Sequence, residues 1–164
     1  MMQKSTYLYE KEDLGLTIGK LPIWYVESEC TGDKQQATIN FYTKNEYDEI
    51  WGPISKIEIS WDKKGRSETY HAKEVQKSID IYNSIKIVVT KKETIWVRSH
   101  EFTYWFGSRT KIIRKKFYPE MSIHGIFYCD ISERVIDIHV AVIKEHFEGF
   151  KPYIIDMFNT IICH

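Results

Sequence analysis

The chain has 164 residues and a mass of 19.6 kDa, the size of one domain that can bury a substantial core. With 43% hydrophobic and 28% charged residues, the composition is that of a globular protein and excludes a disordered or collagenous chain. Basic and acidic residues number 23 each, so no net field draws the chain to nucleic acid or to an acidic membrane.

The apolar residues are those of strands rather than of helices. There are 24 isoleucines and 24 aromatic residues, but only 4 leucines and 3 alanines. Because β-branched and aromatic side chains favour strands, whereas leucine and alanine favour helices, this argues against an all-α fold. We expect a single domain over residues 1–164 that is built mainly from strands.

Alternation of apolar and polar residues predicts strands along most of the chain. In the segment 54–61, Ile57, Ile59 and Trp61 alternate with polar residues, which indicates one buried and one solvated face. The expected strands cover 14–18, 37–42, 54–61, 85–90, 95–106, 111–117, 122–130 and 135–143. Since the later strands are joined by short connections, neighbouring strands must run antiparallel.

Two segments have helical spacing instead. In 68–82, Val75, Ile79 and Tyr82 lie on one face, and apolar residues form a similar stripe over 152–163. The predicted fold is α+β: a twisted antiparallel meander of about six or seven strands with two or three helices, the last one C-terminal and packed on the sheet. A terminal helix rich in isoleucine has little intrinsic stability, so we expect it to depend on that packing.

In the segment 9–26, acidic residues and a glycine lead into a short strand, after which come Pro22, Trp24 and Val26. This opening resembles the start of the PsbP/DcrB-like superfamily. The end of the chain is similar in order, with hairpin strands, the aromatic-rich residues 147–150 and a closing helix. The resemblance implies a central antiparallel sheet flanked by helices, in the same fold group as the Ran-binding nuclear import factor. For most members it also implies a binding or assembly role without catalysis.

Three residues near the end of the chain form one candidate site. In a tight hairpin with Cys129 opposite Ile136, Cys129 points at the apolar face near the hairpin tip, and the last helix returns Cys163 and His164 toward it. Two thiols and an imidazole in one place could bind a soft metal or form a disulfide. The alternative is that both cysteines are small buried hydrophobic residues.

Two histidines on the same hairpin, His124 and His139, form a second candidate. His139, expected opposite Ile126, shares a face with Asp137 and Tyr128, and this combination could act as an acid–base group or form a structural polar cluster. The zincin-like start at His100 and Glu101 is not continued, because Tyr104 stands where the second histidine ligand would be.

A basic and aromatic segment, 104–118, is the third candidate. Cations beside aromatic rings suit single-stranded nucleic acid, whose bases stack while its phosphates meet the charges. Alternation divides the cations between two faces, which favours protection of a sheet edge instead. The residues that would bind a ligand or partner are Tyr104, Trp105, Arg109, Lys111, Arg114 and Tyr118.

We expect a non-enzymatic cytoplasmic binding module, without a cofactor, that takes a protein or small ligand on an aromatic-lined concave face. Nucleic acid is the less favoured partner, and a thiol or metal enzyme is the third interpretation. The first residues contain no apolar run typical of a signal peptide, and no segment has an apolar run long enough to span a membrane, so we expect no membrane partner. The tryptophans Trp24, Trp51, Trp61, Trp96 and Trp105 would line the face only if the sheet left several of them exposed.

Overall fold

The computed structural model describes residues 5–44, 47–48, 52–63 and 70–164. The strands are β1 (Thr6–Lys11), β2 (Leu16–Pro22), β3 (Tyr25–Gly32), β4 (Gln36–Thr43), β5 (Tyr47–Asp48), β6 (Gly52–Pro53), β7 (Ser55–Lys63), β8 (Val88–Val97), β9 (His100–Ile113), β10 (Lys116–Cys129), β11 (Arg134–Ile143) and β12 (Ile161–Ile162). The α-helices are α1 (Tyr70–Ser84) and α2 (Phe147–Phe158), and two short 3-10 helices cover Glu12–Leu14 and Lys144–His146.

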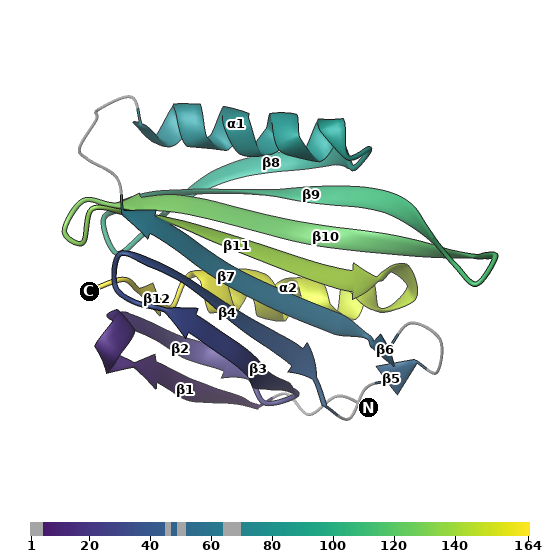
Figure 1. Cartoon of the computed structure of the whole chain (residues 1–164), viewed down its shortest axis with the longest axis horizontal. Coiled ribbons are helices and arrows are strands. Elements are labelled where there is room, and N and C mark those ends of the chain that lie inside the picture. The colour runs from purple at the N-terminus through teal and green to yellow at the C-terminus, as the bar shows by residue number, and fades with distance from the viewer. Residues whose placement is uncertain (1–4, 45–46, 49–51, 64–69) are drawn as a thin grey trace.

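Seven strands form the main sheet, in the order β3-β4-β7-β11-β10-β9-β8, and every neighbouring pair is antiparallel. A second sheet has the order β1-β2-β12, so the last strand pairs with one near the start of the chain. The long strands β9 and β10 extend past their neighbours as a hairpin arm (Figure 1). The predicted α+β class, with an antiparallel sheet and a C-terminal helix packed on it, is confirmed.

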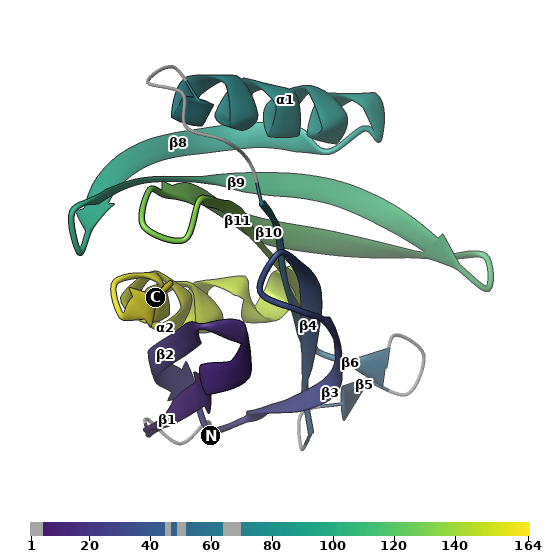
Figure 2. The ribbon, with the colours of Figure 1, turned by 60° about the vertical axis from the view of Figure 1, so that its left-hand side comes forward.

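The main sheet is curved, and the two helices lie on opposite sides of it (Figure 2). Helix α2 and the small sheet fill the inner side, where Phe158 meets Phe102 with ring centroids 5.0 Å apart and Phe150 meets Trp24 at 5.7 Å. Helix α1 packs on β8, β9 and β10 from the outer side and buries Val75 and Tyr82. The outer faces of β4 and β7 carry no helix (Figures 1 and 2).

The predicted strand 111–117 is wrong. The chain turns at Arg114 and Lys115, so these residues join β9 to β10 instead of lying within a strand, and Ile113 pairs with Lys116. Both turn residues have positive φ, 49° and 64°, a conformation that usually requires glycine or asparagine in a two-residue hairpin. The residue types at these two positions therefore do not predict the turn.

The turn of the β10–β11 hairpin lies one residue earlier in the chain than expected. Cys129 pairs with Arg134 rather than with Ile136, and His139 pairs with His124 rather than with Ile126. The four residues Asp130–Glu133 form the turn. Because the register differs by an even number of residues, each side chain stays on its predicted face.

The last helix begins and ends earlier than predicted. It covers Phe147–Phe158 rather than 152–163, and Pro152 lies inside it. Ile161 and Ile162 instead pair with Ile18 and Thr17 of β2, because the free edge of the small sheet satisfies their backbone groups. The expected packing on the main sheet is confirmed.

Candidate functional site

Four metal-ligating side chains meet where the last residues reach the main sheet. Cys129 ends β10, His100 begins β9, and Cys163 and His164 follow β12. One sulfur or nitrogen atom from each residue lies within 4.8 Å of those of the others. Cys129, Cys163 and His100 are buried, whereas His164 is exposed.

The nitrogen atoms of this cluster face the sulfur atoms. His100 Nε2 and His164 Nδ1 each lie 3.4 Å from Cys163 Sγ, and His164 Nδ1 is 3.7 Å from Cys129 Sγ. The other nitrogen of His100, Nδ1, is 3.5 Å from a carboxylate oxygen of Asp130. Burial lowers the pKa of His100, which favours the neutral imidazole, although Asp130 opposes the shift.

The two cysteines are in disulfide-bonding contact, with Cα atoms 6.5 Å apart. This separation is within the range that a disulfide spans. The structure thus brings together all three residues expected at this site and adds His100. Sequence spacing could not find His100, because it comes beside Cys129 only through the β9–β10 register, in which Phe102 pairs with Phe127 two residues further along.

Arg134 fixes the backbone around the cluster. Its side chain, 2% exposed, donates hydrogen bonds to the carbonyl oxygens of Leu14, Gly15 and Cys163 at 2.7, 2.8 and 2.6 Å. The guanidinium also lies over the ring of Trp61, 4.9 Å from its centroid. Burial lowers the pKa of Arg134. One side chain therefore ties the C-terminus to the β1–β2 region.

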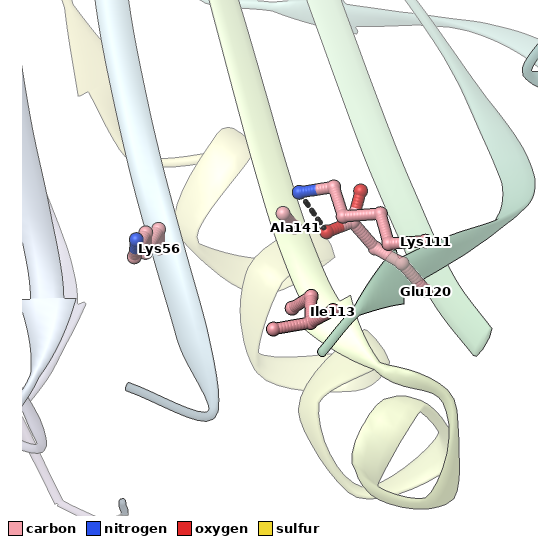
Figure 3. Close-up of a pocket in the computed structure, with 5 residues that line it drawn as sticks. All are labelled: Lys56, Lys111, Ile113, Glu120 and Ala141. Atoms are coloured by element: carbon pink, nitrogen blue, oxygen red, sulfur yellow. Dashed lines mark ion pairs between the residues drawn. The ribbon is translucent and has the colours of Figure 1, made fainter. Parts of the chain in front are cut away.

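A separate hollow lies on the outer face of the main sheet, beside the arm (Figure 3). It has a volume of about 200 Å³ and is lined by Lys56, Lys111, Ile113, Glu120 and Ala141. Glu120 is almost completely buried and pairs with Lys111 at 2.8 Å and with Arg109 at 2.9 Å. A second hollow, of about 470 Å³, extends over β4 and shares Lys56.

The basic and aromatic segment does not form one surface. Tyr104 faces inward and Trp105 faces α1, and both are buried, so neither ring can stack on a base while the sheet is folded. Arg109 and Lys111 are paired with Glu120. The remaining predicted residues, Arg114 and Tyr118, lie in the turn and on β10.

Two exposed apolar residues of the arm lie in the segment 104–118 but are not among its predicted binding residues. Ile112 and Phe117 form a cross-strand pair and are 67% and 73% exposed. That these two side chains form an exposed pair could be predicted only once the turn at Arg114 and Lys115 was known.

The predicted acid–base residues form a buried network under α1. His124 Nδ1 lies 2.6 Å from the hydroxyl of Tyr82, and His124 Nε2 lies 2.8 Å from Asp137 Oδ1. The same hydroxyl contacts His139, and desolvation by burial lowers the pKa of His139 to about 4. The tyrosine in the network is thus Tyr82 rather than the expected Tyr128.

An aromatic-lined concave face is not open in this fold. Trp24, Trp61 and Trp105 are buried, and Trp96 is 71% exposed on β8, while Trp51 lies outside the described residues. The concave side of the sheet is occupied by α2 and the small sheet (Figure 2). The open surface is the outer one.

Within the described residues, none of the helices combines the length and the apolar character that crossing a membrane would require.

The chain resembles known proteins in its structure, whereas sequence comparison finds no match. No family model matches the sequence, and no curated protein matches it. Cyanobacterial PsbP (CyanoP) from Synechocystis is similar over 99% of this chain and 94% of its own, with a TM-score of 0.66 and 8% identity. The Ran-binding protein Mog1p of Saccharomyces cerevisiae is similar over 99% of this chain and 96% of its own, with a TM-score of 0.64 and 7% identity.

A protein of unknown function from Pseudomonas aeruginosa, PA94, is similar over 95% of this chain and 95% of its own, with a TM-score of 0.59 and 10% identity. These likenesses extend over nearly the whole chain, as the resemblance around Pro22 and Trp24 implies. The chain therefore has the fold shared by PsbP and Mog1.

Proposed function

We propose that this chain is a single-domain, non-enzymatic, cytoplasmic module that binds a protein partner on the outer face of its main sheet. The observation that carries the proposal is the part of the outer face that α1 leaves uncovered, which is hollowed beside the arm (Figure 3). Folds of this kind include a Ran-binding protein, so a binding role without catalysis is in keeping with the structural neighbours, although fold alone does not assign a partner.

The charges around the hollow favour an acidic partner. Lys56 is exposed on β7, and Arg114, Lys115 and Lys116 are exposed at the tip of the arm. Glu120 is already neutralised by two cations. A partner with carboxylates opposite the arm would gain mainly in association rate, because charge complementarity steers the encounter.

Nucleic acid is the weaker alternative. Recognition of single strands needs rings on which bases can stack, and two of the three rings expected for that purpose, Tyr104 and Trp105, are buried. The cations of the arm alone would supply only non-specific attraction.

The test is affinity capture from a native lysate with the full chain as bait. Lys56→Glu reverses an exposed charge in the hollow, and Lys92→Glu reverses an exposed charge on β8, the edge strand four places from β7 in the sheet. We expect the captured protein to be lost with Lys56→Glu and retained with Lys92→Glu. Equal capture by both variants would contradict docking at this face.

A further inference from the structure

We infer that His100, Cys129, Cys163 and His164 bind one zinc-like divalent metal ion when the two cysteines are reduced, and that disulfide formation excludes the metal. The donor set, two thiolates and two imidazoles, is that of a closed structural zinc site. The inference is independent of the docking face, which lies on the other side of the sheet.

The distances within the cluster fit a tetrahedral site. Bonds of about 2.3 Å to sulfur and about 2.0 Å to nitrogen place neighbouring sulfur and nitrogen ligands roughly 3.5 Å apart. Three of the four sulfur–nitrogen separations of the cluster are close to this value: His100–Cys163 and His164–Cys163 are 3.4 Å, and His164–Cys129 is 3.7 Å. The two sulfur atoms, which are in disulfide-bonding contact, must separate to roughly 3.8 Å by the same geometry.

The surroundings of the cluster also suit a metal. His100 turns Nε2 toward the sulfur atoms and Nδ1 toward Asp130, the arrangement in which a carboxylate orients a metal-bound imidazole. The backbone N–H of Ser132 donates to Cys129 Sγ at 3.5 Å, which stabilises a thiolate. The hydrogen bond from Arg134 to the Cys163 carbonyl holds the terminal ligands in place.

The disulfide-bonded state and the metal-bound state interconvert through reduction and oxidation of the two cysteines. A dithiol reductant gives two electrons to the Cys129–Cys163 bond, supplies two protons to the sulfur atoms and itself becomes a disulfide. The metal ion then displaces the two thiol protons and forms two metal–sulfur bonds. A disulfide oxidant reverses the process, since sulfur atoms joined to each other no longer carry the thiolate charge that holds the metal.

The experiment uses Co²⁺ as a spectroscopic probe on the full chain, reduced and desalted without oxygen, with Zn²⁺ as the competitor. We expect one Co²⁺ per chain, with the intense visible bands of a tetrahedral site and a thiolate charge-transfer band. Zn²⁺ should remove these bands, and the oxidised chain should bind no stoichiometric metal.

Variants assign the ligands. His164→Ala alters an exposed residue, so it tests the site without risk to the core, and His100→Ala tests the ligand from β9. Both should weaken Co²⁺ binding at least tenfold, and Asp130→Asn should weaken it about 10–100-fold. His146→Ala, outside the cluster, is the control and should bind as the wild type does. Absence of stoichiometric metal in the reduced chain, or affinities of His100→Ala and His164→Ala equal to that of the wild type, would overturn the inference.

Discussion

Replacing Gly125 by alanine should loosen the contact between α2 and the main sheet. A Cβ atom at this position would lie 2.7 Å from Phe102 Cζ and 3.2 Å from Phe158 Cζ. Since carbon atoms in contact prefer about 3.5–4.0 Å, the Phe102 ring would have to retreat by roughly 1 Å. It has little room to do so, because it is fully buried and stacks on Phe127 at 5.3 Å.

Overpacking of this kind costs about 1–3 kcal/mol, and we expect the upper half of that range because two confined rings are displaced. With an m-value of roughly 2 kcal/mol/M, the urea midpoint of Gly125→Ala should fall by about 1 M. Gly149→Ala, at an exposed position in α2, is the matched control and should gain up to about 1 kcal/mol from helix propensity.

A second substitution tests the cause of the loss. Phe102→Leu on the Gly125→Ala background makes room for the new methyl group, so the double variant should lose less than the sum of the two single losses. If Gly125→Ala unfolds at the same urea concentration as the wild type, the close packing of Phe102 and Phe158 over this glycine is not rigid and the reasoning fails.

Three further substitutions test other parts of the fold. Burial lowers the pKa of His139 to about 4, below its ordinary value near 6.5, so the unfolded chain binds the proton first and stability is lost as the pH falls from about 6.5 toward 4. The loss is at most about 3 kcal/mol, and thermal unfolding of His139→Gln at several pH values should show a flatter dependence. Replacing Arg114 and Lys115 by Asn-Gly should stabilise the chain by about 1–2 kcal/mol, because left-handed backbone is costly for other residues; an unchanged urea midpoint would contradict the turn. Arg134→Lys should lower the unfolding free energy by about 2–3 kcal/mol, since one ammonium cannot reach three carbonyl groups, and chemical denaturation measures the loss.

The fold class could be predicted from the sequence because the alternation of apolar and polar residues identifies the strands and their buried faces even where the predicted register is wrong. The β10–β11 register was wrong by two residues, yet Cys129 kept its predicted face, since faces depend only on whether a residue number is odd or even along the strand. The arm could not be predicted in the same way. Its turn at Arg114 and Lys115 lacks the residues that normally mark one.

The candidate metal site could be predicted only in part. Cys129, Cys163 and His164 follow from one hairpin and the return of the chain, which are local steps. His100 depends on the β9–β10 pairing, and that pairing is settled by tertiary contacts such as the stacking of Phe102 on Phe127. The buried network of Tyr82 could not be predicted for a similar reason, because it depends on where α1 packs on the sheet.

The chemistry at Cys129 and Cys163 can change without changing the fold, because other contacts position these residues. β12 has only two residue pairs with β2, and so short a strand has little stability of its own. Arg134 adds hydrogen bonds that reach both the C-terminus and the β1–β2 region from the first residue of β11. A disulfide and a bound metal would each join the end of β10 to the same terminal segment. The backbone contacts therefore fix where the sulfur atoms lie, and the redox state of the surroundings decides which bond they make.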